Sequence, residues 1–465
     1  MSAGSASPTD RGSVVIVPRD KVRALQHTLY RAAKADPGRR FHTLMDKLLR
    51  RDVLWRGWVA VRRNDGAPGI DKLTLDAVEE YGIDRFLTEI QTELREGRYR
   101  PLPARQVLIP KPGQPGQTRP LAIASVRDRV VQAALKIVFE PIFEADFLPC
   151  SFGFRPRRSA HDALHVLDSE AQRGRRWVVE TDIANCFDAI PKDQLIHAVQ
   201  ERVCDQSVLK LLRVVLGAGV MTADGQVRQS VIGTPQGGPL SPLLCNAYLH
   251  QLDRVWSVRE HGVLVRYCDD LVVMCRSREQ AQAALARLGQ LLAQLGLQLK
   301  QAKTRIVRLE VGGSGFDFLG FHHRLMRSRG IRGRRGVTFL ARWPSDKAMR
   351  HARDRLRALT RSSRLLLSVE AIVGDMNMFL RGWGAHFRYG HSAARFTTIS
   401  HYALERLALF VGKRHQRGRR YGLSVVAYLS PNRCGLVNLS GTVVTPRAGT
   451  TPWRERPNAG GERRR

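Results

Sequence analysis

Acidic residues are scarce in this sequence. Its 465 residues include 42 Asp and Glu against 76 Lys and Arg, which gives a formal net charge of +34 at pH 7. This excess is larger than a solvated surface requires, and it favours a polyanionic partner such as a nucleic acid. Hydrophobic residues make up 43% of the chain, which is enough for a sizeable core. We therefore expect a folded protein of two or three domains that binds nucleic acid.

Long apolar runs and paired cysteines are also missing. We find no run of about 18 apolar residues, so the sequence predicts no membrane-spanning helix and no membrane partner. The first 20 residues are polar apart from residues 14–17, unlike a secretory signal. The seven cysteines include no C-x-x-C pair, which argues against a zinc knuckle or a disulfide framework. These features predict a cytoplasmic protein, and its charge suggests association with the nucleoid.

Periodicity and composition divide the chain into four parts. Residues 1–20 are expected to form a flexible tail, and residues 21–325 to form a region that mixes helices and strands. Between 321 and 364 there are fourteen Lys and Arg but only two acids. We therefore place a separate, helical domain at 326–410. The remaining segment, 411–465, is basic and is expected to be partly disordered.

The centre of the chain carries the clearest pattern of strands and helices. Residues 175–183 are predicted to form a buried strand, 263–275 a strand–turn–strand, and 278–299 a long amphipathic helix. A Gly/Pro turn that opens a helix lies between the first two of these at 233–256, and a strand pair follows the last at 316–325. This order matches a split βαβ antiparallel sheet in an α+β protein.

The stretch "VLVRYCDDLV" (263–272) places Asp269 and Asp270 between two apolar strands. Adjacent buried carboxylates repel each other unless a cation neutralises them. Asp182 ends the earlier strand, so three carboxylates are available to hold divalent metal. Mg²⁺ prefers such hard oxygen ligands, and two ions can clamp the oxygens of a phosphoryl transfer. The alternative is an ordinary turn with two solvated acids, which the apolar flanks and Asp182 disfavour.

Seven blocks, in order, resemble the reverse transcriptases encoded by group II introns. They are "NDGAPGID", "IPKPGQPGQTRPLAI", "SFGFRPRRSAHDAL", "VVETDIANCFDAIP", "GTPQGGPLSPLLCNAYL", "YCDD" and "FDFLGF". The segment "LRGWGAHFRYG" (380–390) is similar to that family's thumb or maturase domain. The family's tetrad usually reads Y-A-D-D, and Cys268 stands here in place of alanine. Cysteine is also small and uncharged, so we expect it to be tolerated.

The resemblance implies a right-hand polymerase with fingers, palm and a helical thumb, and it implies roles for individual residues. Asp182, Asp269 and Asp270 would bind two Mg²⁺ ions, with the Ile183 carbonyl as a further ligand. The nucleotide would be bound by a cation at each end of a Gly-rich hairpin, by a ring below its sugar and by an amide: Lys111, Arg119, Phe187 and Gln236. Without the resemblance, the two cations would be ordinary loop residues and Phe187 an ordinary core aromatic.

Two basic and aromatic clusters and a basic run at 412–422 are candidate RNA contacts, because such side chains stack on bases and bind phosphates. The candidates are Phe154, Arg155, Arg157, Arg158, Arg381, Trp383, Lys413 and Arg414. Ser159 is the expected N-cap of a helix that follows the first cluster. The alternatives are a plain basic loop for the first cluster, a core position for Trp383, and a solvated basic run at 412–422.

We therefore predict an RNA-directed DNA polymerase whose partners are an intron RNA template, a DNA or RNA primer, target DNA and dNTPs. Help with intron splicing and intron mobility follow from the resemblance alone. Only Cys434 lies beyond residue 275 among the cysteines, so no HNH nuclease is expected. Two alternatives stay open: a domesticated cellular reverse transcriptase in defence or repair, and a non-catalytic RNA-binding maturase. The intact acids disfavour the second. The sequence leaves the oligomeric state open.

Overall fold

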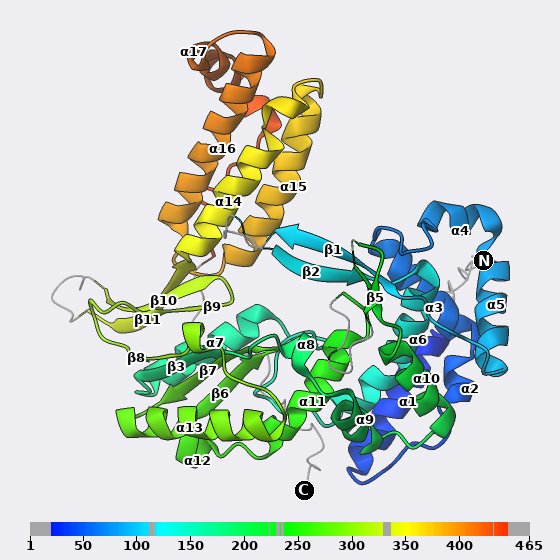
Figure 1. The fold of residues 1–465 in the computed structure, drawn as a ribbon. Helices are drawn as coiled ribbons and strands as arrows, with labels where there is room; N and C mark the ends of the chain where they lie inside the picture. Colours follow the sequence, from blue (N-terminus) through cyan, green and yellow to red (C-terminus); the bar gives the residue numbers. More distant parts are fainter. Residues whose placement is uncertain are drawn as a thin grey trace, which may run out of the picture.

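The structure, a computed structural model, describes residues 20–110, 116, 118–222, 224–228, 233, 237–328, 336–430 and 432–444. Within them it contains helices and three small sheets, arranged as a helical N-terminal part, a central sheet and a tall C-terminal helical bundle (Figure 1). This agrees with the expected α+β class. Among the described helices, none is both long and apolar enough to cross a membrane.

The central sheet has the strand order β6-β7-β3-β8, and every neighbouring pair is antiparallel. Its strands and the helices beside them are β3 (Trp177–Asp182), β6 (Val263–Tyr267), β7 (Asp270–Cys275), β8 (Arg305–Arg308), α7 (Ala160–Gln172), α11 (Ser241–Arg254), α12 (Val258–His261) and α13 (Arg278–Gln294). Val178 and Val272 join one core cluster with residues of α7, whereas Val179 and Val273 join another with residues of α13. Because side chains alternate along a strand, both faces of the sheet are buried.

The N-terminal part is built around one long buried helix, α6. Its elements are α1 (Lys21–Ala35), α2 (Met45–Leu48), α3 (Arg51–Arg63), α4 (Leu75–Tyr81), α5 (Ile83–Arg95), α6 (Val126–Glu144), α9 (Lys192–Gln200) and α10 (Gln206–Leu216). Apolar residues lie on all sides of α6, as expected for a helix covered by neighbours, and α1 and α3 pack on it. The predicted hairpin is β1 (Ala104–Pro110) with β2 (Thr118–Ile123), and β1 also pairs with the short β4 (Val220–Met221), which continues to β5 (Val227–Arg228). Figure 1 shows the hairpin reaching toward the C-terminal bundle.

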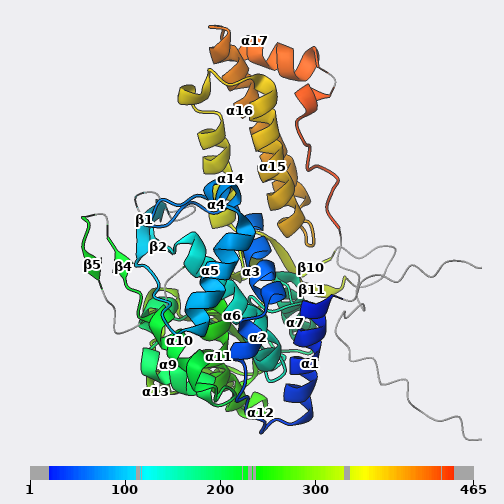
Figure 2. The ribbon, with the colours of Figure 1, turned by 90° about the vertical axis from the view of Figure 1, so that its right-hand side faces the viewer.

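The C-terminal part stands on a three-stranded antiparallel sheet (Figures 1 and 2). Its elements are β9 (Phe316–Phe318), β10 (Phe321–Arg327), β11 (Thr338–Pro344), α14 (Asp346–Leu359), α15 (Val369–Phe387), α16 (Ala393–Arg414) and α17 (Arg419–Leu423), followed by a π-helical turn at Ser424–Tyr428. The boundary expected near 325 falls inside β10, and the one expected near 410 falls inside α16.

The chain after α16 turns back along the bundle. Val426, Leu436 and Leu439 are buried in the bundle core, and the Val444 amide donates to the Arg388 carbonyl, 2.7 Å away. As far as residue 444, the expected basic tail therefore forms part of the same packed unit as α14–α16.

Candidate active site

The central sheet brings the predicted carboxylates together. Asp182, the last residue of β3, lies directly opposite Asp270, the first residue of β7, in antiparallel register. Asp269 lies in the turn before β7, and its carbonyl accepts a hydrogen bond of 3.1 Å from the Ile183 amide. The Asp182 side chain is 9% exposed, whereas the Asp270 side chain is 42% exposed. The site is therefore anchored in the sheet on one side and open to solvent on the other.

A tight turn connects β6 to β7. Tyr267 pairs with Asp270, so only Cys268 and Asp269 connect the two strands. Cys268 has φ near +60°, a conformation that residues other than glycine adopt rarely. Its side chain is buried, with Sγ 3.9 Å from Cys245 Sγ. A small residue fits this position, and the tolerance of cysteine there stays a prediction.

Lys303 supplies the positive charge that the acids need. Its Nζ lies 2.5 Å from Asp182 Oδ2 and 3.9 Å from Asp270 Oδ1. The Nζ of Lys300 lies 3.8 Å from the same Asp182 oxygen. Both lysines follow α13, and the Lys300 amide donates to the Asp182 carbonyl, which ties this segment to the end of β3. An ammonium group thus occupies the position beside the carboxylates.

The carboxylates affect one another electrostatically. Burial, followed by the negative charges of Asp182 and Asp269, raises the pKa of Asp270 to about 7. Burial and the charge of Asp182 likewise raise the pKa of Asp269. Burial opposes the charged form of Lys303, but its hydrogen bond with Asp182 and the nearby acids raise its pKa overall. Such a concentration of negative charge is typical of a site that receives a cation.

The Asp182 and Asp270 carboxylates fit an open site, in which water and substrate complete the shell of a hard cation, better than a site whose ligands all come from the protein. Within the described ranges, no group of three or more Asp, Glu, His or Cys side chains is arranged as a ready-made metal site. Mg²⁺ commonly takes one or two protein carboxylates and completes its shell with water and substrate phosphates. The paired, partly open carboxylates of Asp182 and Asp270 suit that mode. The participation of Asp269 as a third metal ligand stays a prediction.

The structure places two of the four predicted nucleotide contacts. Arg119 lies on β2 opposite Ile109 of β1, and it is exposed. Phe187 lies half-buried in α8 (Cys186–Ala189), the short helix after β3. Lys111 and Gln236 lie outside the described residues.

Gly233 explains part of the "GTPQGG" block. A Cβ on Gly233 would lie 2.8 Å from Asp188 Cα, and its backbone has φ near +94°. Its amide donates to the Ile190 carbonyl at 2.8 Å. Only glycine allows this close approach, so the beginning of the block lies against the helix that carries Phe187.

The first basic and aromatic cluster separates into two groups. Phe154 is 55% exposed with its ring 6.4 Å from that of Tyr267, and Arg157 is also exposed. Arg155 is buried: it pairs with Glu144 at 2.6 Å and donates to the carbonyls of nearby residues. The predicted RNA contact of Arg155 is therefore corrected, because its guanidinium is used inside the protein.

Arg158 is half-buried, with its guanidinium 5.3 Å from the centre of the Phe152 ring. Ser159 caps α7 in a full capping box with Asp162, as predicted. The helix therefore begins where the sequence indicated, and Arg158 lies between the core and the surface.

The second cluster also divides. Arg381 is exposed on α15, but Trp383 is buried, with ring centres 4.8 Å from Phe387 and 5.4 Å from Phe396. Trp383 is therefore a core residue, and its predicted RNA contact is corrected. Lys413 and Arg414 end α16 and are exposed, although Arg414 donates to the carbonyls of the loop that precedes α15.

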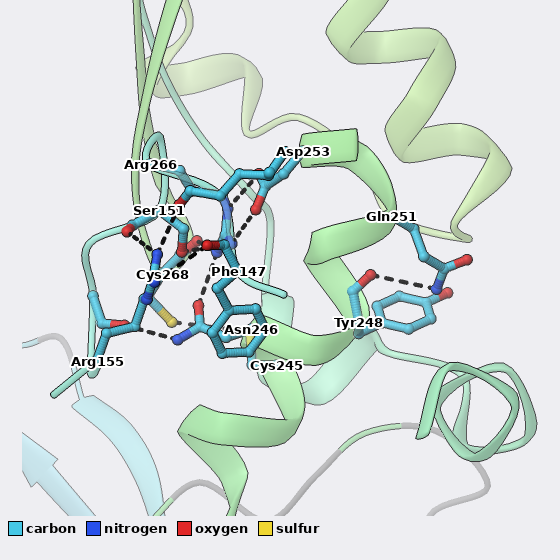
Figure 3. Close-up of polar contacts among 12 residues, drawn as sticks. Phe147, Ser151, Arg155, Cys245, Asn246, Tyr248, Gln251, Asp253, Arg266 and Cys268 are labelled. Carbon is cyan, nitrogen blue, oxygen red and sulfur yellow. Dashed lines mark hydrogen bonds and ion pairs between the residues drawn. The ribbon is translucent and has the colours of Figure 1, made fainter. Parts of the chain in front are cut away.

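Sequence reasoning missed two cations, Lys303 and Arg266. Arg266 lies on β6, two residues before Cys268 of the β6–β7 turn, and is fully buried (Figure 3). An arginine inside the apolar run "VLVRY" was the available signal for Arg266. Lys303 gave no local signal, because its segment resembles any basic loop.

Comparison with known proteins identifies the family. The family described as "Reverse transcriptase (RNA-dependent DNA polymerase)" matches residues 109–323, and "Group II intron, maturase-specific domain" matches residues 349–424. The chain belongs to the group II intron-encoded reverse transcriptases. The first match ends within β10 and the second runs from α14 into the turn after α17. The maturase match thus extends beyond residue 410, in agreement with the packing of that region.

Individual relatives support this reverse transcriptase–maturase assignment. Protein YkfC of Escherichia coli (strain K12) is 33% identical over 375 residues, which cover 71% of this chain and 94% of the relative. The group II intron-encoded protein LtrA of Lactococcus lactis subsp. cremoris is 38% identical over 216 residues, covering 46% of this chain and 35% of LtrA. An uncharacterized 91 kDa protein in the cob intron of Schizosaccharomyces pombe is 29% identical over 429 residues. This chain spans 52% of that last protein's length and 35% of LtrA's. The predicted family and enzyme class are confirmed.

Proposed function

We propose that this protein extends a primer 3′-OH with dNTPs on an RNA template and releases pyrophosphate. The observation that carries the proposal is the cross-strand pair of Asp182 and Asp270, with Asp269 in the adjoining turn, inside the segment that matches reverse transcriptases. In the expected right-hand architecture, with a split βαβ palm, this pair lies on the palm. The helical bundle is then the thumb, and the N-terminal helices and hairpin are the fingers.

Asp182, Asp269 and Asp270 would hold Mg²⁺, two ions in the full reaction complex, with the Ile183 carbonyl as a further ligand. When bound, the ions would offset the negative charge that develops during phosphoryl transfer. The carboxylates must be ionised to bind Mg²⁺, so any carboxyl group that carries a proton in the free protein has to lose it. Lys303 balances part of their charge in the free protein.

The remaining side chains would position the substrates. The primer hydroxyl loses its proton and attacks the α-phosphorus, and the bond to pyrophosphate breaks. Lys111 and Arg119 would bind the triphosphate, which suits cations at the two ends of a hairpin. The ring of Phe187 would lie below the sugar and exclude a 2′-OH, and Gln236 would contact the nucleotide and template edge. Most of the rate enhancement then comes from positioning.

Nucleic acid would be bound over a wide surface. Phe154 lies near Tyr267 at the β6–β7 turn, Arg157 is exposed in the same loop as Phe154, and Arg381, Lys413 and Arg414 lie on the proposed thumb. The partners we propose are intron RNA, a DNA or RNA primer and target DNA, in the cytoplasm near the nucleoid. Splicing assistance and intron mobility would use the same protein, through the thumb and its matched maturase segment.

Primer extension tests the proposal. The purified protein should extend an oligo(dT) primer on poly(rA) with Mg²⁺, and Asp270→Asn should lower the rate by about 10³-fold because a cation loses its anchor. Binding of the RNA duplex should barely change, since phosphates are bound by Lys and Arg elsewhere. Retained extension by Asp270→Asn would overturn the metal assignment. A wild-type protein that binds intron RNA without extending primers would favour the non-catalytic maturase.

A further inference from the structure

Arg266 is the centre of a buried hydrogen-bonded cluster next to the Cys268–Asp269 turn, and each N–H group of its guanidinium has an acceptor. Its Nε and Nη2 donate to the two carboxylate oxygens of Asp253 at 2.9 and 2.6 Å. Its other donors reach Asn246 Oδ1 at 2.9 Å, the Cys268 carbonyl at 3.2 Å and Ser151 Oγ at 2.8 Å. These bonds use all five N–H groups of the guanidinium (Figure 3). Both Arg266 and Asp253 have fully buried side chains.

The cluster reaches the residue that shapes the turn. Cys268 has the positive φ angle, its carbonyl accepts from Arg266, and the next residue is Asp269. A backbone with this φ persists only when its surroundings hold it. The backbone of Arg266 also holds β6 against the neighbouring segment 150–152. The Arg266 amide donates to the Cys150 carbonyl, and the Arg266 carbonyl accepts from the Phe152 amide. Arg266 thus connects the turn to the segment 150–152.

The same cluster reaches the exposed loop beside the turn. Asn246 Nδ2 donates to the Gly153 carbonyl at 2.7 Å. A Cβ on Gly153 would lie 2.6 Å from the Cys268 amide nitrogen, so the loop packs directly against the turn. The next residue is Phe154, whose ring is exposed near Tyr267. Asn246 is therefore bonded to both sides: its oxygen to Arg266 and its amide nitrogen to the loop.

Only arginine fits this position. Burial opposes the charge of Arg266, but the paired Asp253 carboxylate raises its pKa, so the guanidinium stays charged. A lysine has three donors on a single nitrogen and cannot reach four acceptor groups that lie in a fork. An apolar residue would leave the Asp253 carboxylate buried without a partner.

We propose that Arg266, with Asp253, Asn246 and Ser151, is a positioning residue for catalysis. It fixes the Cys268–Asp269 turn, and through Asn246 it makes the placement of the carboxylates depend on the loop that carries Phe154. Nucleic acid bound at that loop would then reinforce the geometry of Asp269 and Asp270. The inference rests on the proposed polymerase function, so its test includes a measurement that needs no polymerisation.

The main experiment compares Arg266→Lys with Arg202→Lys. Arg202 is a matched control: it is buried, it pairs with Asp146 at 3.0 Å, and it donates to the Ala33 carbonyl, away from the turn. Arg266→Lys should lower kcat by about 100-fold with a small change in KM for dNTP, because displaced carboxylates misplace the reacting groups. It should also weaken equilibrium Mn²⁺ binding, followed by electron paramagnetic resonance. Arg202→Lys should lower the melting temperature while keeping kcat and Mn²⁺ binding.

Two milder variants keep the test decisive if Arg266→Lys does not fold. Ser151→Ala removes one acceptor and should lower Mn²⁺ affinity in the same direction. Asn246→Asp keeps the acceptor for Arg266 but removes the donor to Gly153, so it should abolish the gain in Mn²⁺ affinity that bound primer–template gives the wild type. Equal effects of the Arg266 and Arg202 variants, or unchanged Mn²⁺ binding in all three variants of the cluster, would overturn the inference. A wild type that binds Mn²⁺ but never extends primers would refute the polymerase proposal alone.

Discussion

Asp182 and Asp270 face each other across the antiparallel strands β3 and β7, and Lys303 Nζ lies within 4 Å of both, at 2.5 and 3.9 Å. An ammonium beside this carboxylate pair offsets part of its negative charge when no metal is bound. The same geometry makes Lys303 a competitor for any cation that binds there. The apolar β6–β7 hairpin thus tolerates its adjacent acids partly because Lys303 lies beside the carboxylates.

Lys303→Met should therefore strengthen metal binding. Removing one positive charge a few ångströms from the site should raise Mg²⁺ affinity by about tenfold, given the size of screened interactions near a protein surface. Isothermal titration of the free protein measures the effect. Lys300→Met is the matched control, because Lys300 lies farther from Asp182, at 3.8 Å, and should produce a smaller increase. Weaker binding in Lys303→Met would mean that the lysine organises the carboxylates rather than competing for them.

Phe187 should control the choice of sugar. Phe187→Ala or Phe187→Val should raise ribonucleotide incorporation relative to dNTP, because the space under the sugar would then admit a 2′-OH. Single-nucleotide incorporation with dNTP and NTP measures the ratio. Phe187→Tyr keeps the ring and should keep the discrimination. An unchanged ratio in an active Phe187→Ala variant would make Phe187 a core residue only.

Because the protein carries a large positive net charge, its affinity for RNA should fall steeply as the salt concentration rises. Each neutralised phosphate contributes a slope of about −0.7 to −0.9 in log affinity against log salt. The contacts at the end of the C-terminal bundle show which of its basic residues should be kept in this test. Arg414 donates to the Leu365 carbonyl and Arg419 pairs with Glu405 at 2.6 Å, so both also support the fold. The better choice is to replace Lys413, Arg417 and Arg420 with glutamine, which should reduce the magnitude of the slope by about two.

Short-template extension should stay nearly intact in that triple variant, because a short duplex needs only fingers, palm and the body of the thumb. Arg276→Gln with Arg278→Gln is a control, since these exposed arginines lie just before and at the beginning of α13, and α13 lies on the opposite side of the central sheet from the C-terminal bundle (Figure 1). An unchanged slope in the triple variant would make the thumb end a solvated basic surface. Loss of extension would place it in the polymerase core.

A half-buried histidine, His250, should make the fold sensitive to acid. Burial lowers the pKa of His250 to about 4 from an ordinary value of 6.5. Between those values the unfolded chain binds more protons than the folded one, so this contribution to stability is complete above about pH 6.5 and is lost as the pH falls toward 4. The pKa of Asp168, raised by burial to about 6, acts in the opposite direction over part of this range.

A difference measurement isolates the histidine. The free energy of unfolding in urea should fall less between pH 7.5 and pH 5 for His250→Gln than for the wild type, because glutamine takes up no proton. Equal losses in the two proteins would mean that His250 is not neutral in the folded state at pH 5.

The sequence by itself determined the elements and the order of the motifs. Continuous apolar runs gave β3, β6 and β7, helical spacing gave α13, and Ser159 was recognised as a cap. These features depend on neighbouring residues, because apolar runs, helical periodicity and capping are local. The carboxylates could also be singled out, since charged residues inside apolar runs are costly without a function.

Tertiary structure decided which of several similar cations has which role. Arg155 and Arg157 are two residues apart in one basic loop, yet Arg155 is buried against Glu144 and Arg157 is exposed. Lys303 reaches Asp182 from a distant segment, and Arg266 meets Asp253 and Ser151 only after the chain has folded. Such pairings depend on the packing of segments far apart in sequence, and no local periodicity encodes which donor reaches which acceptor.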